Sequence, residues 1–299
     1  MTSSVSAAGT ARTIEVTTRI GCRLACSYCP QSTLTAAFRT LPDRGKAVMD
    51  PADFQSFLST VPPSVDVHFS GFGEPWHNRD CTQMVEHAVD KGHHVAVFTT
   101  ADGMTEDDID RVAQLPLKRF VLHLPDALEE MRLAVNAAYI AKVAYLQNRL
   151  ADRLELLTIG APHRAFATLD RRRHMVTRRI QDRAGNVRIE GRTIGSAYSP
   201  EDIAVRTRGQ PLRCRKDRML SNVLLPNGDL VVCAMDYGLE NRIGNLARQT
   251  YAEIQADVPF AQFLRRTLDG SEGFICSRCE YALAGAYSAV EIERMVSDV

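Results

Sequence analysis

Short apolar runs alternate with amphipathic stretches along the first two thirds of the chain. Helical spacing begins at residue 51 and recurs at 82–91, 106–115 and 128–150. β-branched and apolar residues predict strands at 13–18, 65–69, 95–98, 119–123 and 154–159, with a sixth at 187–189. Repeated strand–helix units favour a parallel sheet with right-handed crossovers. Six units predict an α/β fold, a partial (β/α)6 barrel of the TIM type, with chemistry at the carboxyl ends of its strands.

The pattern changes near residues 197–210, where Ser, Pro, Gly and charged residues replace periodic apolar ones. Beyond it, apolar runs at 219–225 and 230–233 flank an Asn-Gly turn, which predicts a β-hairpin, and a helix is expected at 251–268. We therefore predict three parts. They are a flexible N-terminus at 1–12, the partial barrel at 13–205 and a small hairpin-and-helix domain at 206–299.

Composition excludes several classes of partner. Lys and Arg together number 36 and so do Asp and Glu, so nothing in the net charge favours nucleic acid or a membrane surface. The basic run at 171–173, with Arg178 and Arg179, is typical of a solvated helix face. No signal-peptide or membrane-spanning pattern occurs, so we expect a cytoplasmic protein that acts on a small molecule. Seven of the eight cysteines lie at metal-type spacings, which favours reduced thiolates over disulfides.

Three cysteines directly follow the first predicted strand. Cys22, Cys26 and Cys29 have the spacing C-x3-C-x2-C. Three thiolates leave one iron of a [4Fe-4S] cluster open to a non-protein ligand. A zinc site usually closes with a fourth Cys or His. Zinc, or three unrelated buried cysteines, is the alternative.

Four further cysteines form a second set: Cys214, Cys233, Cys276 and Cys279. Two long intervals precede a final C-x2-C. Four thiolates complete either an iron–sulfur cluster or a zinc site, and spacing alone does not choose between them.

The three-cysteine loop resembles the cluster motif of the radical S-adenosylmethionine (SAM) superfamily. The resemblance implies that SAM chelates the open iron and that Tyr28 lies beside its adenine. The segment Phe69-Ser70-Gly71-Phe72-Gly73-Glu74-Pro75 is similar to the Gly-Gly-Glu-Pro motif of that family, with Phe72 in place of the first Gly. The family's SAM contacts then correspond to Gly71, Gly73, Glu74 and Pro75, with Thr99 and Ile159 at two further strand ends.

The C-terminal part resembles the twitch extension of radical SAM enzymes, a shortened SPASM domain, in its hairpin and in Ile243-Gly244-Asn245-Leu246. This implies a second, fully ligated [4Fe-4S] cluster on the four cysteines, and a reductant such as flavodoxin or ferredoxin. A cluster without an open iron suits an electron acceptor. The overall layout also resembles radical SAM dehydrogenases of aminoglycoside biosynthesis, and this resemblance implies dehydrogenation of a secondary alcohol in an amino-sugar, cyclitol or related intermediate of antibiotic biosynthesis.

Three residues are candidates for catalysis. Asp236, three residues after Cys233, takes a hydroxyl proton, or it forms a helix cap or a surface salt bridge. Arg183, in a stretch resembling the Arg-Ala-Gly-Asn of this family, holds a polar substrate or the SAM carboxylate, or is solvated. Cys81 donates a hydrogen atom in an epimerase acting on a sugar or peptide, or is a small buried hydrophobe.

Two further functions compete with dehydrogenation and epimerisation. One is the modification of ribosomal peptides, for which an N-terminal recognition domain lacks room before the first strand. The second is a zinc- or cluster-stabilised binding protein without enzymatic activity, which would not cleave SAM.

Overall fold

A nine-stranded open sheet organises the molecule. The computed structural model describes residues 12–169, 173–177, 181–187, 209–269 and 275–292. The strands follow the order β10-β9-β8-β1-β2-β3-β4-β5-β6, and β1 to β6 are parallel. The predicted α/β partial barrel is confirmed, and no closed barrel forms within the described ranges. The first six strands are β1 (Thr13–Val16), β2 (Asp66–Phe69), β3 (Val95–Thr99), β4 (Arg119–His123), β5 (Leu154–Ile159) and β6 (His174–Thr177).

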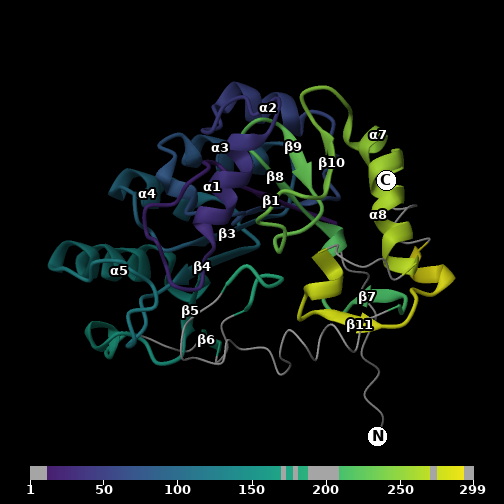
Figure 1. Cartoon of the computed structure of the whole chain (residues 1–299). Helices are drawn as coiled ribbons and strands as arrows, with labels where there is room; N and C mark the ends of the chain where they lie inside the picture. The colour runs from purple at the N-terminus through teal and green to yellow at the C-terminus, as the bar shows by residue number, and fades with distance from the viewer. Residues whose placement is uncertain (1–11, 170–172, 178–180, 188–208, 270–274, 293–299) are drawn as a thin grey trace, which may run out of the picture.

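The helices between these strands begin where the sequence supplies caps. Asp50 accepts a hydrogen bond from the Asp53 N–H at the start of α2, and Thr105 forms a capping box with Asp108 at the start of α4. In Figure 1, α2 to α5 follow the sheet along one side. The bounds are α1 Gln31–Thr40, α2 Pro51–Leu58, α3 Cys81–Asp90, α4 Glu106–Gln114 and α5 Ala137–Leu150.

One predicted helix begins later than expected, and the described sheet contains a strand that was not predicted. The helix predicted at 128–150 begins at residue 137, because Asn136 caps it by accepting from the Tyr139 N–H. In the described sheet the sixth strand is 174–177, which pairs in parallel with β5, and a side-chain hydrogen bond of 2.9 Å joins His174 to Thr158 of β5. This strand lies within the basic run that suggested a helix face. Val187 ends a turn by donating to the Asp182 carbonyl, and residues 188 and 189 lie outside the described ranges.

The predicted C-terminal hairpin is confirmed, and it extends the barrel sheet. Strand β8 (Ser221–Leu224) pairs in parallel with β1, and β9 (Asp229–Val231) and β10 (Arg242–Asn245) continue the sheet in antiparallel order. The helix expected at 251–268 is split at Asp257 into α7 (Tyr251–Ala256) and α8 (Val258–Asp269). Both helices lie beside β10 in Figure 1. A separate pair, β7 (Leu212–Cys214) and β11 (Ala282–Ala284), brings the ends of this region together.

The core fills the space between the sheet and its helices. Side chains such as Ile14, Val16 and Phe69 are fully buried against residues of α2 and α3. Burial of this kind contributes roughly 1.5–3 kcal/mol for each large apolar side chain. Residues 1–11 of the predicted N-terminal segment and most of the boundary at 197–210 fall outside the described residues, while Arg12 is described and buried. No helix in the described ranges is long and apolar enough to cross a membrane.

Candidate active site

The three cysteines of the first motif line one cavity of about 170 Å³. They follow β1, and a tight turn in which Cys29 N donates to the Cys26 carbonyl (3.1 Å) folds their loop. Burial raises the pKa of the Cys22 thiol, and it raises that of Cys26 to about 11. Soft thiolates are suitable ligands for iron–sulfur clusters, and ligation removes the thiol protons. The donor set therefore fits a cluster held by three cysteines.

Gln31, at the first position of α1, ties this loop together, and the sequence motifs did not predict it. Its Oε1 accepts from the backbone N–H of Cys22 (3.1 Å), while its Nε2 lies 3.4 Å from the Cys29 sulfur. The same Nε2 donates to the Phe72 carbonyl. One amide thus links two cysteines to the turn after β2. A polar residue directly after Cys-Pro was the available signal.

The turn after β2 approaches β1 so closely that only glycine fits at its first position. Gly71 has φ +43°, and a Cβ there would lie 2.3 Å from Thr17 Oγ1 and 2.7 Å from the Val16 carbonyl. Phe72 N donates to Thr17 Oγ1 (2.9 Å), and the buried Phe72 ring contacts Tyr237 at a centroid distance of 4.7 Å. The side chain that departs from the family pattern is therefore a packing residue, and Gly71 and Gly73 line the cavity.

We expect Gly71→Ala to displace this turn. The positive φ alone costs about 1–2 kcal/mol for a residue with a Cβ, and the clash with β1 backbone adds to it. The variant should lose SAM affinity, measured by equilibrium dialysis, and unfold at a lower temperature. Gly209→Ala is the matched control, because Gly209 has φ +60° with nothing within 4 Å of the added Cβ. Equal SAM affinity in the two variants would contradict this role.

Glu74 is held in the cavity wall by the end of β3. Its carboxylate accepts from Thr99 Oγ1, from Thr100 N (2.7 Å) and Oγ1 (2.8 Å), and from Trp76 N (3.2 Å). Burial raises the pKa of this carboxyl while these donors oppose the shift. A cation bound beside it would favour the carboxylate. Thr99 and Thr100 therefore shape the cavity partly by holding the Glu74 carboxylate in place.

Aromatic groups close the remainder of the cavity. Tyr28 lies against His123, at the end of β4, with ring centroids 5.9 Å apart. Burial lowers the pKa of His123 to about 4, so the imidazole is neutral at pH 7. The Tyr237 hydroxyl lies 3.7 Å from the Cys29 sulfur. Neither His123 nor Tyr237 was predicted, because each reaches the cavity only through the fold.

The second set of cysteines gathers between β7, β11 and the segment after β9. Cys214, Cys276 and Cys279 line a common small cavity, and buried Cys233 is close enough for its charge to raise the pKa of the Cys276 thiol. Burial, the larger cause, raises the pKa of all four thiols, for Cys279 to about 12. All eight cysteines of the chain are free. Within the described residues, no three His, Cys, Asp or Glu side chains are arranged to hold a single metal ion.

Arg183 lies between the two cysteine sets. Its guanidinium carbon is 6.0 Å from the Tyr237 ring centroid, and the carbonyl of the next residue, Ala184, accepts from Nε of Arg278 (3.1 Å), which stands between Cys276 and Cys279. The Nε of Arg183 is buried and has no hydrogen-bond partner among the described residues. A buried guanidinium nitrogen is costly unless it is paired. A bound ligand would supply the missing acceptor.

The remaining predicted residues lie away from this cavity. Asp236 is fully buried and accepts from the Glu240 and Asn241 backbone N–H groups, which is a turn cap. Cys81 is fully buried in the core at the start of α3. Pro75 is buried at the start of a short 3-10 helix, and its carbonyl accepts from Thr18. Ile159 ends β5, but Leu157 is the residue of that strand that lines the cavity.

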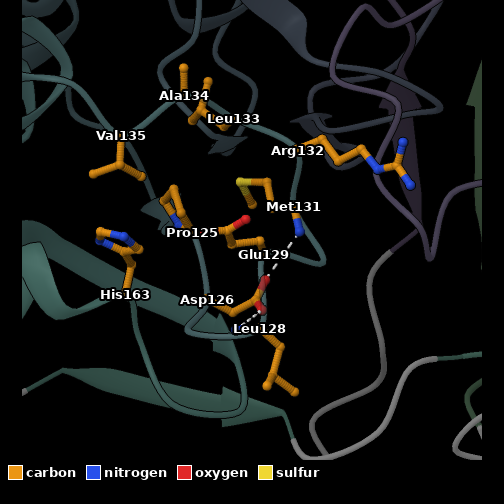
Figure 2. A pocket seen from close by; sticks show the side chains of 10 residues that line it. All are labelled: Pro125, Asp126, Leu128, Glu129, Met131, Arg132, Leu133, Ala134, Val135 and His163. Carbon is orange, nitrogen blue, oxygen red and sulfur yellow. Dashed lines mark hydrogen bonds between the residues drawn. The ribbon is translucent and has the colours of Figure 1, made fainter.

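A larger cavity of about 600 Å³ lies in the loop between β4 and α5. Figure 2 shows its lining, with the Asp126 carboxylate turned towards the backbone of its own loop and Arg132 extending away. Asp126 accepts from three N–H groups, those of Leu128, Glu130 and Met131. The Glu130 carbonyl in turn accepts from the Ser27 N–H (3.0 Å). This loop therefore supports the cysteine loop from outside.

Comparison with known proteins supports an iron–sulfur assignment for the second cysteine set. Residues 214–280 match the model of the SPASM family, an iron–sulfur cluster-binding domain. Sequence comparison with curated proteins finds no match. Among solved structures, BtrN in complex with AdoMet and 2-DOIA is 16% identical with a TM-score of 0.57, covering 92% of this chain and 93% of that chain.

Two more solved structures are similar in fold. Streptococcus suis SuiB bound to precursor peptide SuiA is 13% identical with a TM-score of 0.60, covering 91% of this chain and 70% of that chain. The structure of anSMEcpe with bound AdoMet is 14% identical with a TM-score of 0.56, covering 95% of this chain and 84% of that chain. The resemblance predicted from the cysteine motifs is confirmed. The chain therefore shares the overall fold of these solved structures, and its residues 214–280 match the iron–sulfur cluster-binding domain of the SPASM family.

Proposed function

We propose that this chain is a radical SAM dehydrogenase that oxidises a secondary alcohol of a small polar substrate, such as an amino-sugar or cyclitol. The first [4Fe-4S] cluster would be held by Cys22, Cys26 and Cys29, and the second by the four C-terminal cysteines. When bound, SAM and the first cluster would supply a 5′-deoxyadenosyl radical that removes a hydrogen atom from the substrate, and the second cluster would supply an acceptor for one electron. Loss of the hydroxyl proton completes the two-electron oxidation to a ketone.

The residues of the chain position these groups. Gly71 and Gly73 leave their backbone accessible in the cavity wall, and the anchored Glu74 suits the SAM ammonium group. Tyr28 and His123 offer ring faces beside the same space. Because His123 is neutral at pH 7, it adds no positive charge next to the SAM sulfonium.

The observation that carries the proposal is the position of Arg183, beside Tyr237 of the first cavity and next to Ala184, whose carbonyl accepts from Arg278 between Cys276 and Cys279. A substrate that satisfies its guanidinium would lie between the radical source and the auxiliary cluster. Arg provides a planar fork that matches vicinal oxygen atoms better than an ammonium does. The BtrN complex contains 2-DOIA, which supports a small-molecule substrate of similar class.

The second candidate is modification of a peptide, favoured by SuiB, whose structure contains a precursor peptide. Epimerisation with Cys81 as the hydrogen donor is less favoured, because that thiol is buried in the core and does not line the cavity. A free thiol donor must reach the substrate radical.

Cys81→Ala separates oxidation from epimerisation. With reconstituted protein, SAM, dithionite and a panel of aminocyclitols, we expect the variant to form ketone and 5′-deoxyadenosine in the wild-type ratio, measured by mass spectrometry. Cys81→Ser is the conservative control. A product of unchanged mass and inverted stereochemistry that disappears in both variants would replace the proposal with the epimerase. Processing of peptides alone would favour the second candidate.

A further inference from the structure

A groove of about 330 Å³ opens beside the first cysteine of the three-cysteine loop. Four of the side chains that line it are of basic type: Arg19, Arg23, His77 and Arg79. Gly21 also lines it, so the groove reaches the residue immediately before Cys22. The surface beside this part of the cysteine loop is therefore rich in arginine.

Much of this positive charge is not neutralised within the protein. Arg19 and Arg79 are exposed, and neither forms an ion pair with any residue in the described ranges. Arg23 is 2.8 Å from Asp102, which also contacts His77. Asp102 and Asp80 lie beside the groove but do not line it. Because the whole chain carries no net charge, the arginines are a local concentration and not the result of a basic protein.

We infer that this groove is the docking surface for an acidic one-electron carrier protein. The inference rests on the proposed function, since the cluster at Cys22, Cys26 and Cys29 must gain the one electron that the carrier loses. Electron transfer slows steeply with distance, so a donor must dock where the cluster is nearest to the surface. Complementary charge accelerates such an encounter and orients the partner, and it weakens with salt.

The test compares two variants with the same change in net charge. Arg19→Glu with Arg79→Glu reverses two groove charges, and Arg39→Glu with Arg265→Glu reverses two exposed charges elsewhere. The first readout is binding of oxidised flavodoxin to the reconstituted protein, followed by flavin fluorescence. The second is 5′-deoxyadenosine formation, driven either by reduced flavodoxin or by dithionite, which needs no docking site.

We expect the groove variant to weaken flavodoxin binding and flavodoxin-driven cleavage by about tenfold or more, with dithionite-driven cleavage unchanged. The control pair should change binding less than about twofold. Equal binding by both variants would overturn the docking surface. So would loss of flavodoxin binding in millimolar inorganic phosphate at constant ionic strength, which would identify a small-anion site. Absence of dithionite-driven SAM cleavage in the wild type would refute the proposed function. The comparison of flavodoxin binding between the two variants would still test whether the groove is the docking surface.

Discussion

Cys26→Ala should abolish SAM cleavage while leaving the second cluster in place. Cys26 lines the same cavity as Cys22 and Cys29, and two thiolates do not retain a cluster that already has one open iron. We expect iron to fall from about eight to about four atoms per chain, with 5′-deoxyadenosine at background. The test is to measure iron and sulfide per chain and to quantify the 5′-deoxyadenosine formed.

The control for this change is Cys81→Ala, a cysteine that belongs to neither set and is buried in the core. It should keep both clusters and SAM cleavage, although a cavity of one sulfur atom costs some stability. If Cys26→Ala retained SAM cleavage with four irons per chain, the first motif would not be the site of SAM chemistry.

Cys276→Ala should separate radical formation from substrate oxidation. Cys276 is half-buried in the second set and lies far in sequence from the first motif. The variant should hold about four irons and still cleave SAM, because the first cavity contains none of the second set. Without an electron acceptor, the ketone formed per 5′-deoxyadenosine should fall to near zero.

SAM cleavage by the same preparation also tests whether the variant is correctly folded. Retained SAM cleavage shows that the barrel is intact, since β8 of the C-terminal part pairs directly with β1. Cys276→Ser offers a weaker ligand of similar size as a second test. Ketone formation at the wild-type ratio in both variants would remove the auxiliary cluster as the electron acceptor.

The sequence predicted the strands of the partial barrel well where burial is one-sided or complete. It failed at β6, whose residues 175–177 are exposed, because a solvated strand shows no hydrophobic alternation. The start of α5 was wrong because apolar residues such as Met131 and Leu133 continue the helical spacing into a loop that Asp126 organises.

The residues of the candidate site could be predicted where they belong to short motifs with a fixed spacing in the sequence. The seven cysteines and Gly71 to Glu74 belong to this class, and the fold gathers the cysteines into two sets and places the turn in the cavity wall. Tyr237 and His123 reach the cavity from segments far from the cysteine loop in sequence, which no short motif records, whereas Gln31 directly follows Cys29-Pro30 and its local signal was not recognised. Asp236 was a candidate because it follows Cys233, but its burial and its two N–H donors make it a cap.

The proposed chemistry requires two [4Fe-4S] clusters and SAM cleavage in one chain. Anaerobic reconstitution, followed by iron, sulfide and zinc analysis and an assay for 5′-deoxyadenosine with dithionite and SAM, tests this requirement directly. We predict about eight irons and eight sulfides per chain with cleavage of SAM. Zinc at the cysteines with no 5′-deoxyadenosine would contradict the proposal.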